Sequence, residues 1–100
     1  ENTISPYSAT TTVRTTLGNI LLKQGKPYEA IALFKDELEL RPNLAVAHDG
    51  LGWSYLELNK LTQSRTAFKA ALKAQPLSYL THEGLREIKK RIANIKLSQN

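Results

Sequence analysis

Two histidines, His48 and His82, are the residues of the chain best suited to binding a metal or moving a proton. Each has an acidic neighbour, Asp49 or Glu83, and the two histidines lie 34 positions apart. A zinc site needs three or four ligands, usually with a local pair at helical spacing, and each histidine here stands alone. The chain also has no cysteine, which excludes thiolate ligands, disulfides and thiol catalysis. We therefore expect histidines packed between helices and no metal site.

No other residues form a pattern typical of catalysis or cofactor binding. The carboxylates near the histidines, Asp49, Glu57, Glu83 and Glu87, show no recognisable acid–base pairing. The serines and threonines near the N-terminus lie in no nucleophile motif, and no glycine-rich phosphate loop follows a strand. We expect a protein that is not an enzyme and that needs no cofactor.

Length and charge set further bounds. One hundred residues with 41% hydrophobic content suffice for one domain with a modest core. No apolar run reaches the roughly 18 residues of a membrane span. The net charge of +5 is concentrated in residues 84–100, which we interpret as a solvated helix face rather than a phosphate-binding tail. Residues 1–10 read as a polar linker without a signal peptide, as in a processed or excised piece of a longer protein.

A repeat of 34 residues organises the chain. The stretch LGNILLKQGK (residues 17–26) aligns with LGWSYLELNK (51–60), and HDGL (48–51) aligns with HEGL (82–85). Apolar residues recur at three- and four-residue steps within each unit, which indicates amphipathic helices. Gly25 and Asn59 are residue types that follow helix ends. We expect antiparallel helices at about 9–24, 28–40, 44–58, 62–75 and 78–96.

These residues resemble the tetratricopeptide repeat. Its pattern W-x2-L-G-x2-Y, then Ala, Phe and Pro, is matched twice, although Arg14, His48, Leu21 and Glu37 depart from it. The resemblance implies an all-α, right-handed superhelical stack of helix hairpins, with repeats at 11–44 and 45–78, a capping helix at 79–97 and a tail at 98–100. It also implies a set of helix-packing positions, which are Leu17, Gly18, Ala30, Phe34, Pro42, Leu51, Gly52, Tyr55, Ser64, Phe68, Ala71 and Pro76.

The two glycines beside Trp53 need a reason, because glycine inside a helix costs about 1 kcal/mol relative to alanine. Gly52 matches Gly18, and we expect it to let the helices of one hairpin approach opposite Ser64. Gly50 matches Gly84, and we expect it on the side shared between successive repeats, where a bare backbone leaves room beside Trp53.

In stacked hairpins the first helix of each unit lines a concave groove that binds extended partners. Trp53 would stand at its centre, either as a binding anchor or merely packed against the neighbouring first helices. The residues expected at the groove are Thr15, Asn19, Leu22, Lys23, Asp49, Trp53, Leu56, Glu57, Glu83 and Glu87, with Lys90 and Arg91 of the last helix.

The groove predicts a protein or peptide partner. Some members of the family hold C-terminal carboxylates in a clamp of lysine, arginine and asparagine, and only Asn19 fits that pattern here. We therefore expect a partner that carries an apolar anchor and a basic residue, bound by a scaffold or assembly factor. Two alternatives stay open. The chain is a self-associating or structural part of a longer array, using the face of Thr12, Arg14 and Thr16, or its basic last helix contacts nucleic acid or an anionic surface. The sequence leaves the compartment open.

Overall fold

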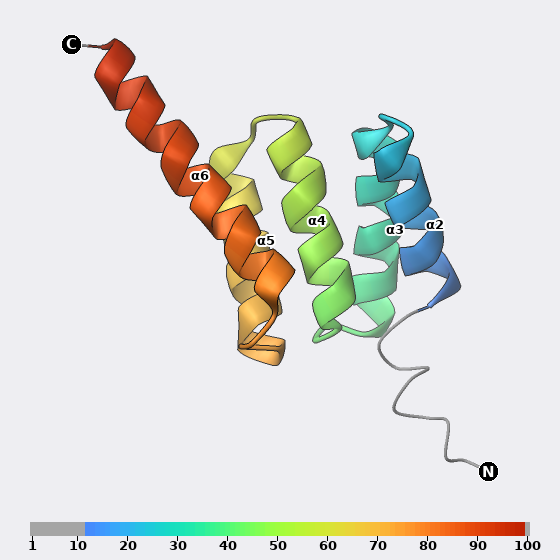
Figure 1. Ribbon diagram of the computed structural model, residues 1–100. Coiled ribbons are helices and arrows are strands. Elements are labelled where there is room, and N and C mark those ends of the chain that lie inside the picture. The colour runs from blue at the N-terminus through green and yellow to red at the C-terminus, as the bar shows by residue number, and fades with distance from the viewer. Residues whose placement is uncertain (1–11, 100) are drawn as a thin grey trace.

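Five helices make up the part of the chain that the computed structural model describes, residues 12–99 (Figure 1). They are α2 (Val13–Lys23), α3 (Pro27–Leu40), α4 (Ala45–Glu57), α5 (Leu61–Ala74) and α6 (Tyr79–Ser98). No strand occurs among these residues. The prediction of an all-α helical repeat is confirmed. None of these helices combines the length and the apolar character that crossing a bilayer requires.

The ends of the helices follow from local chemistry. Thr12 begins α2 with a capping box, in which its side chain accepts from the backbone of Thr15 and the Thr15 side chain accepts from the backbone of Thr12. The predicted start of this helix, near residue 9, falls on residues 9–11, which lie outside the described part. Within the described part the helix begins after Thr12, which has an extended backbone conformation. Gly25 (φ 78°) and Asn59 (φ 58°) take the left-handed conformation that ends α2 and α4 and starts the turn to the next helix.

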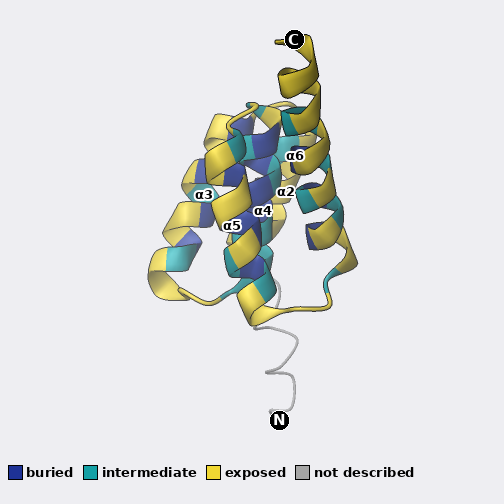
Figure 2. Cartoon of the chain, turned by 90° about the vertical axis from the view of Figure 1, so that its left-hand side faces the viewer, coloured by how far each residue is buried: buried dark blue, intermediate teal, exposed yellow. Residues whose placement is uncertain are grey.

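The helices stand side by side, with α2 and α6 at opposite ends of the stack (Figure 1). The helix α4 contacts α2 on one side and α6 on the other, so the first helices of the successive units form one continuous row. The second helices, α3 and α5, pack behind this row. Figure 2 shows that buried positions gather where the two rows face each other, whereas the outer surfaces and the end of α6 are exposed.

Two phenylalanines, Phe34 and Phe68, hold the rows together. Each ring is fully buried and lies against two glycines, one in its own hairpin and one in the next first helix. A Cβ atom built at Gly18 or Gly50 would come within 3.0 Å of the Phe34 ring, and one at Gly52 or Gly84 equally close to Phe68. The glycines therefore make the space that the rings fill, at the same positions in both units.

The roles expected for the two glycines beside Trp53 can now be compared with the structure. Gly52 does face the second helix of its hairpin, where the Ser64 hydroxyl donates to its carbonyl at 2.7 Å. Gly50 does lie on the side shared between successive units, but the space at this glycine belongs to Phe34 and not, as expected, to Trp53. Because Phe34 comes from the preceding unit, Gly50 is the recess that joins one hairpin to the next.

Three of the expected helix-packing residues lie outside the core. Leu17 is 44% exposed, and with Val13 and Ile20 it lines an open groove on α2 that no further helix covers among residues 12–99. Pro42 and Pro76 are exposed in the loops that follow α3 and α5. The prolines end the second helices and orient the connection, and they contribute little buried area.

Candidate functional site

A pocket of about 300 Å³ opens between α4 and α6, on the row of first helices. All of its lining residues belong to the set expected at the groove, and they are Trp53, Leu56, Glu57, Glu83, Glu87 and Arg91. Leu56 is nearly fully buried and forms the floor, whereas Glu57 is exposed at the rim. The pocket thus combines an apolar surface with an excess of carboxylates.

Trp53 takes part in both the core and the pocket. Its ring meets Phe68 edge-on, with centroids 5.3 Å apart and planes at 79°. The side chain is half-buried, so another part of the indole lines the pocket. The two roles that the sequence left open are therefore compatible, since Phe68 holds the indole while the pocket side stays accessible.

Arg91 joins α6 to the end of α4 at the edge of the pocket. Its guanidinium donates to the backbone carbonyl of Leu56 at 2.9 Å and to the side chain of Asn59 at 3.3 Å. It also donates to Glu87 at 2.9 Å. Arg91 thus holds α6 against the end of α4 and also pairs with one carboxylate of the pocket, that of Glu87.

Two further carboxylates, Glu83 and Glu57, line the pocket beside Glu87. A hydrogen bond from Tyr79, with a further one from Arg86 at 2.5 Å, holds the pKa of Glu83 below its usual range. Glu57 makes no hydrogen bond or ion pair to another described residue. Three glutamates against the one arginine in the lining leave the pocket negative, which favours a basic group of a ligand.

Asp49 has a structural contact instead of a place in the pocket lining. It accepts a hydrogen bond from the Thr81 hydroxyl at 2.7 Å, which ties the start of α6 to α4. Burial raises the pKa of Asp49, and the hydrogen bond from Thr81 acts in the opposite direction. We expected Asp49 at the binding groove, but it is not among the residues that line the pocket.

The residues expected from the first unit are not brought into the pocket either. Thr15 is fully buried, because its short side chain completes the cap of its own helix, so its assignment to the groove surface is wrong. Leu22 is half-buried against the core around Phe34. Asn19 and Lys23 are exposed on α2 but lie outside the pocket lining.

The histidines bind loop carbonyls rather than packing between helices. Nε2 of His48 lies 2.8 Å from the carbonyl oxygen of Pro42, and Nε2 of His82 lies 2.9 Å from that of Pro76. A carbonyl only accepts, so Nε2 carries the proton in both rings. The spacing of six residues between proline and histidine, present in both units, was the sequence signal for this contact. Among residues 12–99, no group of three or more metal-ligating side chains lies close enough to hold an ion.

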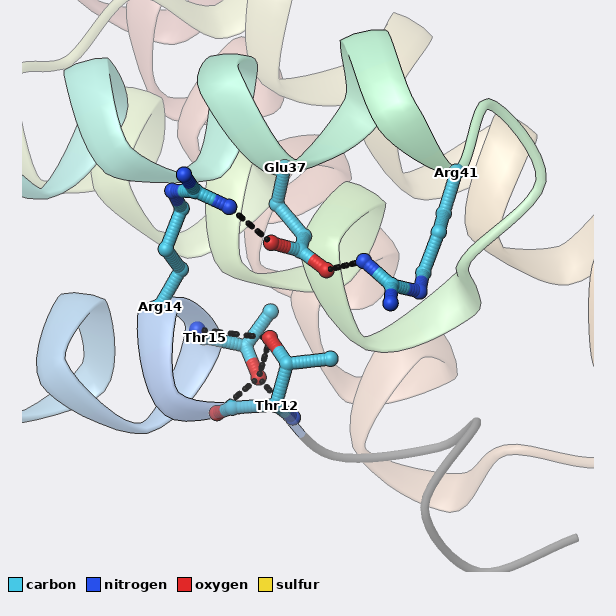
Figure 3. Close-up of polar contacts among 5 residues, drawn as sticks. All are labelled: Thr12, Arg14, Thr15, Glu37 and Arg41. Carbon is cyan, nitrogen blue, oxygen red and sulfur yellow. Dashed lines mark hydrogen bonds and ion pairs between the residues drawn. The ribbon is translucent and has the colours of Figure 1, made fainter. Parts of the chain in front are cut away.

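A buried carboxylate lies between two arginines in the first unit (Figure 3). Glu37 is 1% exposed, and its oxygens accept from Arg14 at 3.1 Å and from Arg41 at 2.6 Å. Burial works to raise the pKa of Glu37, but Arg14 and Arg41 together lower it below its usual range. The cluster links α2 to the end of α3 and lies apart from the pocket lining.

Paired helices repeated every 34 residues, joined by phenylalanines in glycine recesses, define an α-helical repeat solenoid. The sequence model of the tetratricopeptide repeat matches residues 7–76, and the chain belongs to this family. Proteins of the family generally mediate protein–protein interactions, bind proteins or peptides, and are typically non-catalytic. A comparison with curated proteins gives no match.

Proposed function

We propose that the chain is a non-catalytic interaction module that binds a peptide or helix of a partner in the pocket between α4 and α6, as part of a scaffold or assembly factor. The observation that carries this proposal is the pocket itself, in which a half-buried tryptophan and three glutamates converge from two helices. Neither a metal cluster nor a phosphate loop competes with it among residues 12–99.

The chemistry of the pocket selects a partner with an apolar side chain next to a lysine or arginine. The apolar side chain packs on Trp53 and Leu56, as aromatic anchors commonly bind at interfaces. The basic group meets Glu57, which is free at the rim, and can also lie against the indole face. A ligand carboxylate is disfavoured by the same glutamates.

The single tryptophan gives a direct test. A synthetic peptide with one leucine and one arginine in a glycine–serine background is titrated while the fluorescence of Trp53 is followed. We expect a saturable change, and none with a peptide in which glutamate replaces the arginine. Equal responses to both peptides, or none to either up to about 1 mM, contradict the proposal.

Two charge reversals separate the pocket from the general charge of the protein. Glu57→Lys is expected to weaken binding of the arginine peptide by about three- to tenfold, because a rim carboxylate becomes repulsive. Glu39→Lys, on the exposed side of α3, makes the same change in net charge and is expected to leave binding unaltered. If the two variants weaken binding equally, the pocket is not the site.

A second candidate function is self-association through the outer side of α2. Val13 is 85% exposed and Ile20 46%, and with Leu17 they line an open groove of about 500 Å³. Thr16 is the repeat equivalent of Gly50 and Gly84, the two glycines that make room for the phenylalanine of the preceding hairpin. The outer side of α2 therefore has no glycine recess for the phenylalanine of another such hairpin. Sedimentation over a range of concentrations tests the candidate, and a strict monomer removes it.

A further inference from the structure

A second groove, of about 520 Å³, lies between α5 and α6. Leu85, Ile88 and Ile92 of α6 form its apolar part. Its other lining residues are all basic: Arg65 and Lys69 of α5, and Lys89 of α6. We call it the basic groove, to separate it from the acidic pocket between α4 and α6.

The repeat shows what kind of element such a surface accepts. Shifted by 34 residues, Leu85 and Ile92 correspond to Leu51 and Leu58 of α4. Those two leucines pack in the core cluster that also holds Ala67, on the second helix of their own hairpin. The basic groove is therefore the face to which a first helix binds its antiparallel second helix. On α6 this face is only partly covered, since Leu85 and Ile92 are half-buried.

The chain does not turn back onto this face at the repeat position. The helix α4 ends at Glu57, and Asn59 then takes the left-handed conformation that starts the turn to α5. The corresponding residue of α6 is Ala93, which lies within a continuous helix that runs to Ser98. Ile95 extends the apolar stripe and is 45% exposed. The missing turn leaves this face of the described chain without a second helix at the repeat position.

The charges around the groove indicate the chemistry of an occupant. No carboxylate of residues 12–99 lines it, and the three basic side chains flank the apolar residues contributed by α6. A second copy of α6 is a poor match, because it would bring Lys89 against the basic rim again. A helix with acidic residues on both sides of an apolar stripe matches both the apolar residues of α6 and the three basic side chains beside them.

We propose that the basic groove binds an amphipathic helix of a partner protein, with acidic residues flanking its apolar stripe, in the position of a second helix packed on α6. The site is distinct from the acidic pocket, so the protein has two binding faces of opposite charge on the two sides of α6. The proposal does not depend on a ligand in the acidic pocket.

Nuclear magnetic resonance of the full 100-residue chain tests this placement. The probe is a synthetic amphipathic peptide of about 18 residues, with leucines at helical spacing and glutamates on either side of them. We expect its addition to shift the backbone signals of Lys69, Leu85 and Ile92 and to leave the indole signal of Trp53 in place. The same peptide with lysines in place of the glutamates is expected not to bind the groove.

Charge reversal gives the matched comparison. The double variant Lys69→Glu with Lys89→Glu is expected to bind the acidic peptide about tenfold more weakly than the wild type, and this difference should shrink at high salt, which screens both the attraction and the repulsion. The control Lys35→Glu with Lys90→Glu changes the net charge equally; Lys35 is the counterpart of Lys69 one unit earlier, and both residues are exposed outside the groove. Circular dichroism establishes that all variants are folded.

Three results would overturn the proposal. The first is equal affinity of both double variants for the acidic peptide. The second is resonance shifts on peptide addition that are confined to the acidic pocket. The third is a change in the signals of Leu85 and Ile92 with protein concentration alone, which would show a second copy in the groove. Binding of the arginine peptide to the acidic pocket is measured on the same variants and is expected to persist, so either site can fail without the other.

Discussion

The two repeat units share one core contact and differ in the polar position beside it. In both, a phenylalanine fills a recess made by two glycines, one of them in the next first helix. The residue three positions after that phenylalanine is Glu37 in the first unit and Ala71 in the second, and both are almost completely buried. The same backbone geometry therefore accepts a small apolar residue or a carboxylate held by two arginines.

The partners of that position explain how the carboxylate is tolerated. Arg14 and Arg41 reach Glu37 in the first unit, and the corresponding residues of the second are His48 and Gln75. His48 turns instead to the carbonyl of Pro42. The phenylalanine contact thus defines the stack, while the polar residues change together as a set. Each prediction below breaks or sharpens this comparison.

The largest effect is expected from removing the shared contact. Phe34→Ala and Phe68→Ala should each lower the free energy of unfolding by about 3–5 kcal/mol, because each leaves a cavity between two helices. Phe68→Ala belongs at the upper end, since it also removes the edge contact with Trp53. Urea denaturation measures both. Tyr28→Ala, at a side chain that is 67% exposed, is the control and should change stability by less than about 0.5 kcal/mol.

The next effect separates the two units. Glu37→Ala alone leaves Arg14 and Arg41 without their acceptor and should lower the melting temperature by several degrees. The triple variant Arg14→His, Glu37→Ala, Arg41→Gln gives the first unit the residues of the second and should recover most of the loss. A triple variant no more stable than the single one would show that the units are not interchangeable at this position.

The acid limb of stability tests the same cluster. Because the folded-state pKa of Glu37 is lowered, its contribution is complete above the unfolded value of 4.5 and is lost as the pH falls through the folded pKa. Melting temperatures of the wild type and the Glu37→Ala variant, measured between neutral and acidic pH, should converge as the pH falls. Parallel curves would contradict the assignment.

A smaller effect is expected at the glycine recess. Gly50→Ala gains helix propensity but places a Cβ atom against the Phe34 ring, and a net loss of about 1–3 kcal/mol should follow from overpacking. The reverse substitution at the matching position, Thr16→Gly, relieves no contact with a phenylalanine and should cost less than about 0.5 kcal/mol of helix propensity. A Gly50→Ala protein as stable as the wild type would show that the recess has room to spare.

The sequence predicted the parts of the structure that depend on periodicity. The 34-residue repeat, the helices and their turns at Gly25 and Asn59 follow from spacing and residue type alone. The lining of the acidic pocket also lies within the predicted groove set. Local patterns sufficed here, because each unit repeats the same short-range chemistry.

What the sequence did not predict depends on which neighbour is present. Leu17 matches Leu51 in the repeat, yet it is exposed because α2 is an end of the described stack. Thr15 and Asp49 are equivalent by register, but one caps its own helix and the other binds the helix that follows. Equivalent positions have different surroundings at the end and in the middle of an array, and a repeat alignment carries no information about that difference.

The smallest effect concerns this last pair. The pKa of Asp49 is raised by burial, so the folded state holds the proton more tightly than the unfolded chain does. Stability from this group is therefore greatest below the unfolded value of 3.8 and falls as the pH rises through the folded pKa. Asp49→Asn keeps an oxygen for the Thr81 hydroxyl and removes the charge, so it should stabilise the protein at neutral pH. Since the site is partly open to solvent, the gain should stay below about 1 kcal/mol.

Thermal unfolding at several pH values checks this last prediction. The advantage of Asp49→Asn should shrink toward zero as the pH approaches 3.8, because the wild-type carboxyl is then protonated in the folded state. Asp36→Asn, at an exposed position of α3, removes the same charge and should show no such trend. A loss of stability with Asp49→Asn at neutral pH would mean that the charged form of Asp49, and not only its hydrogen bond to Thr81, holds α6 on α4.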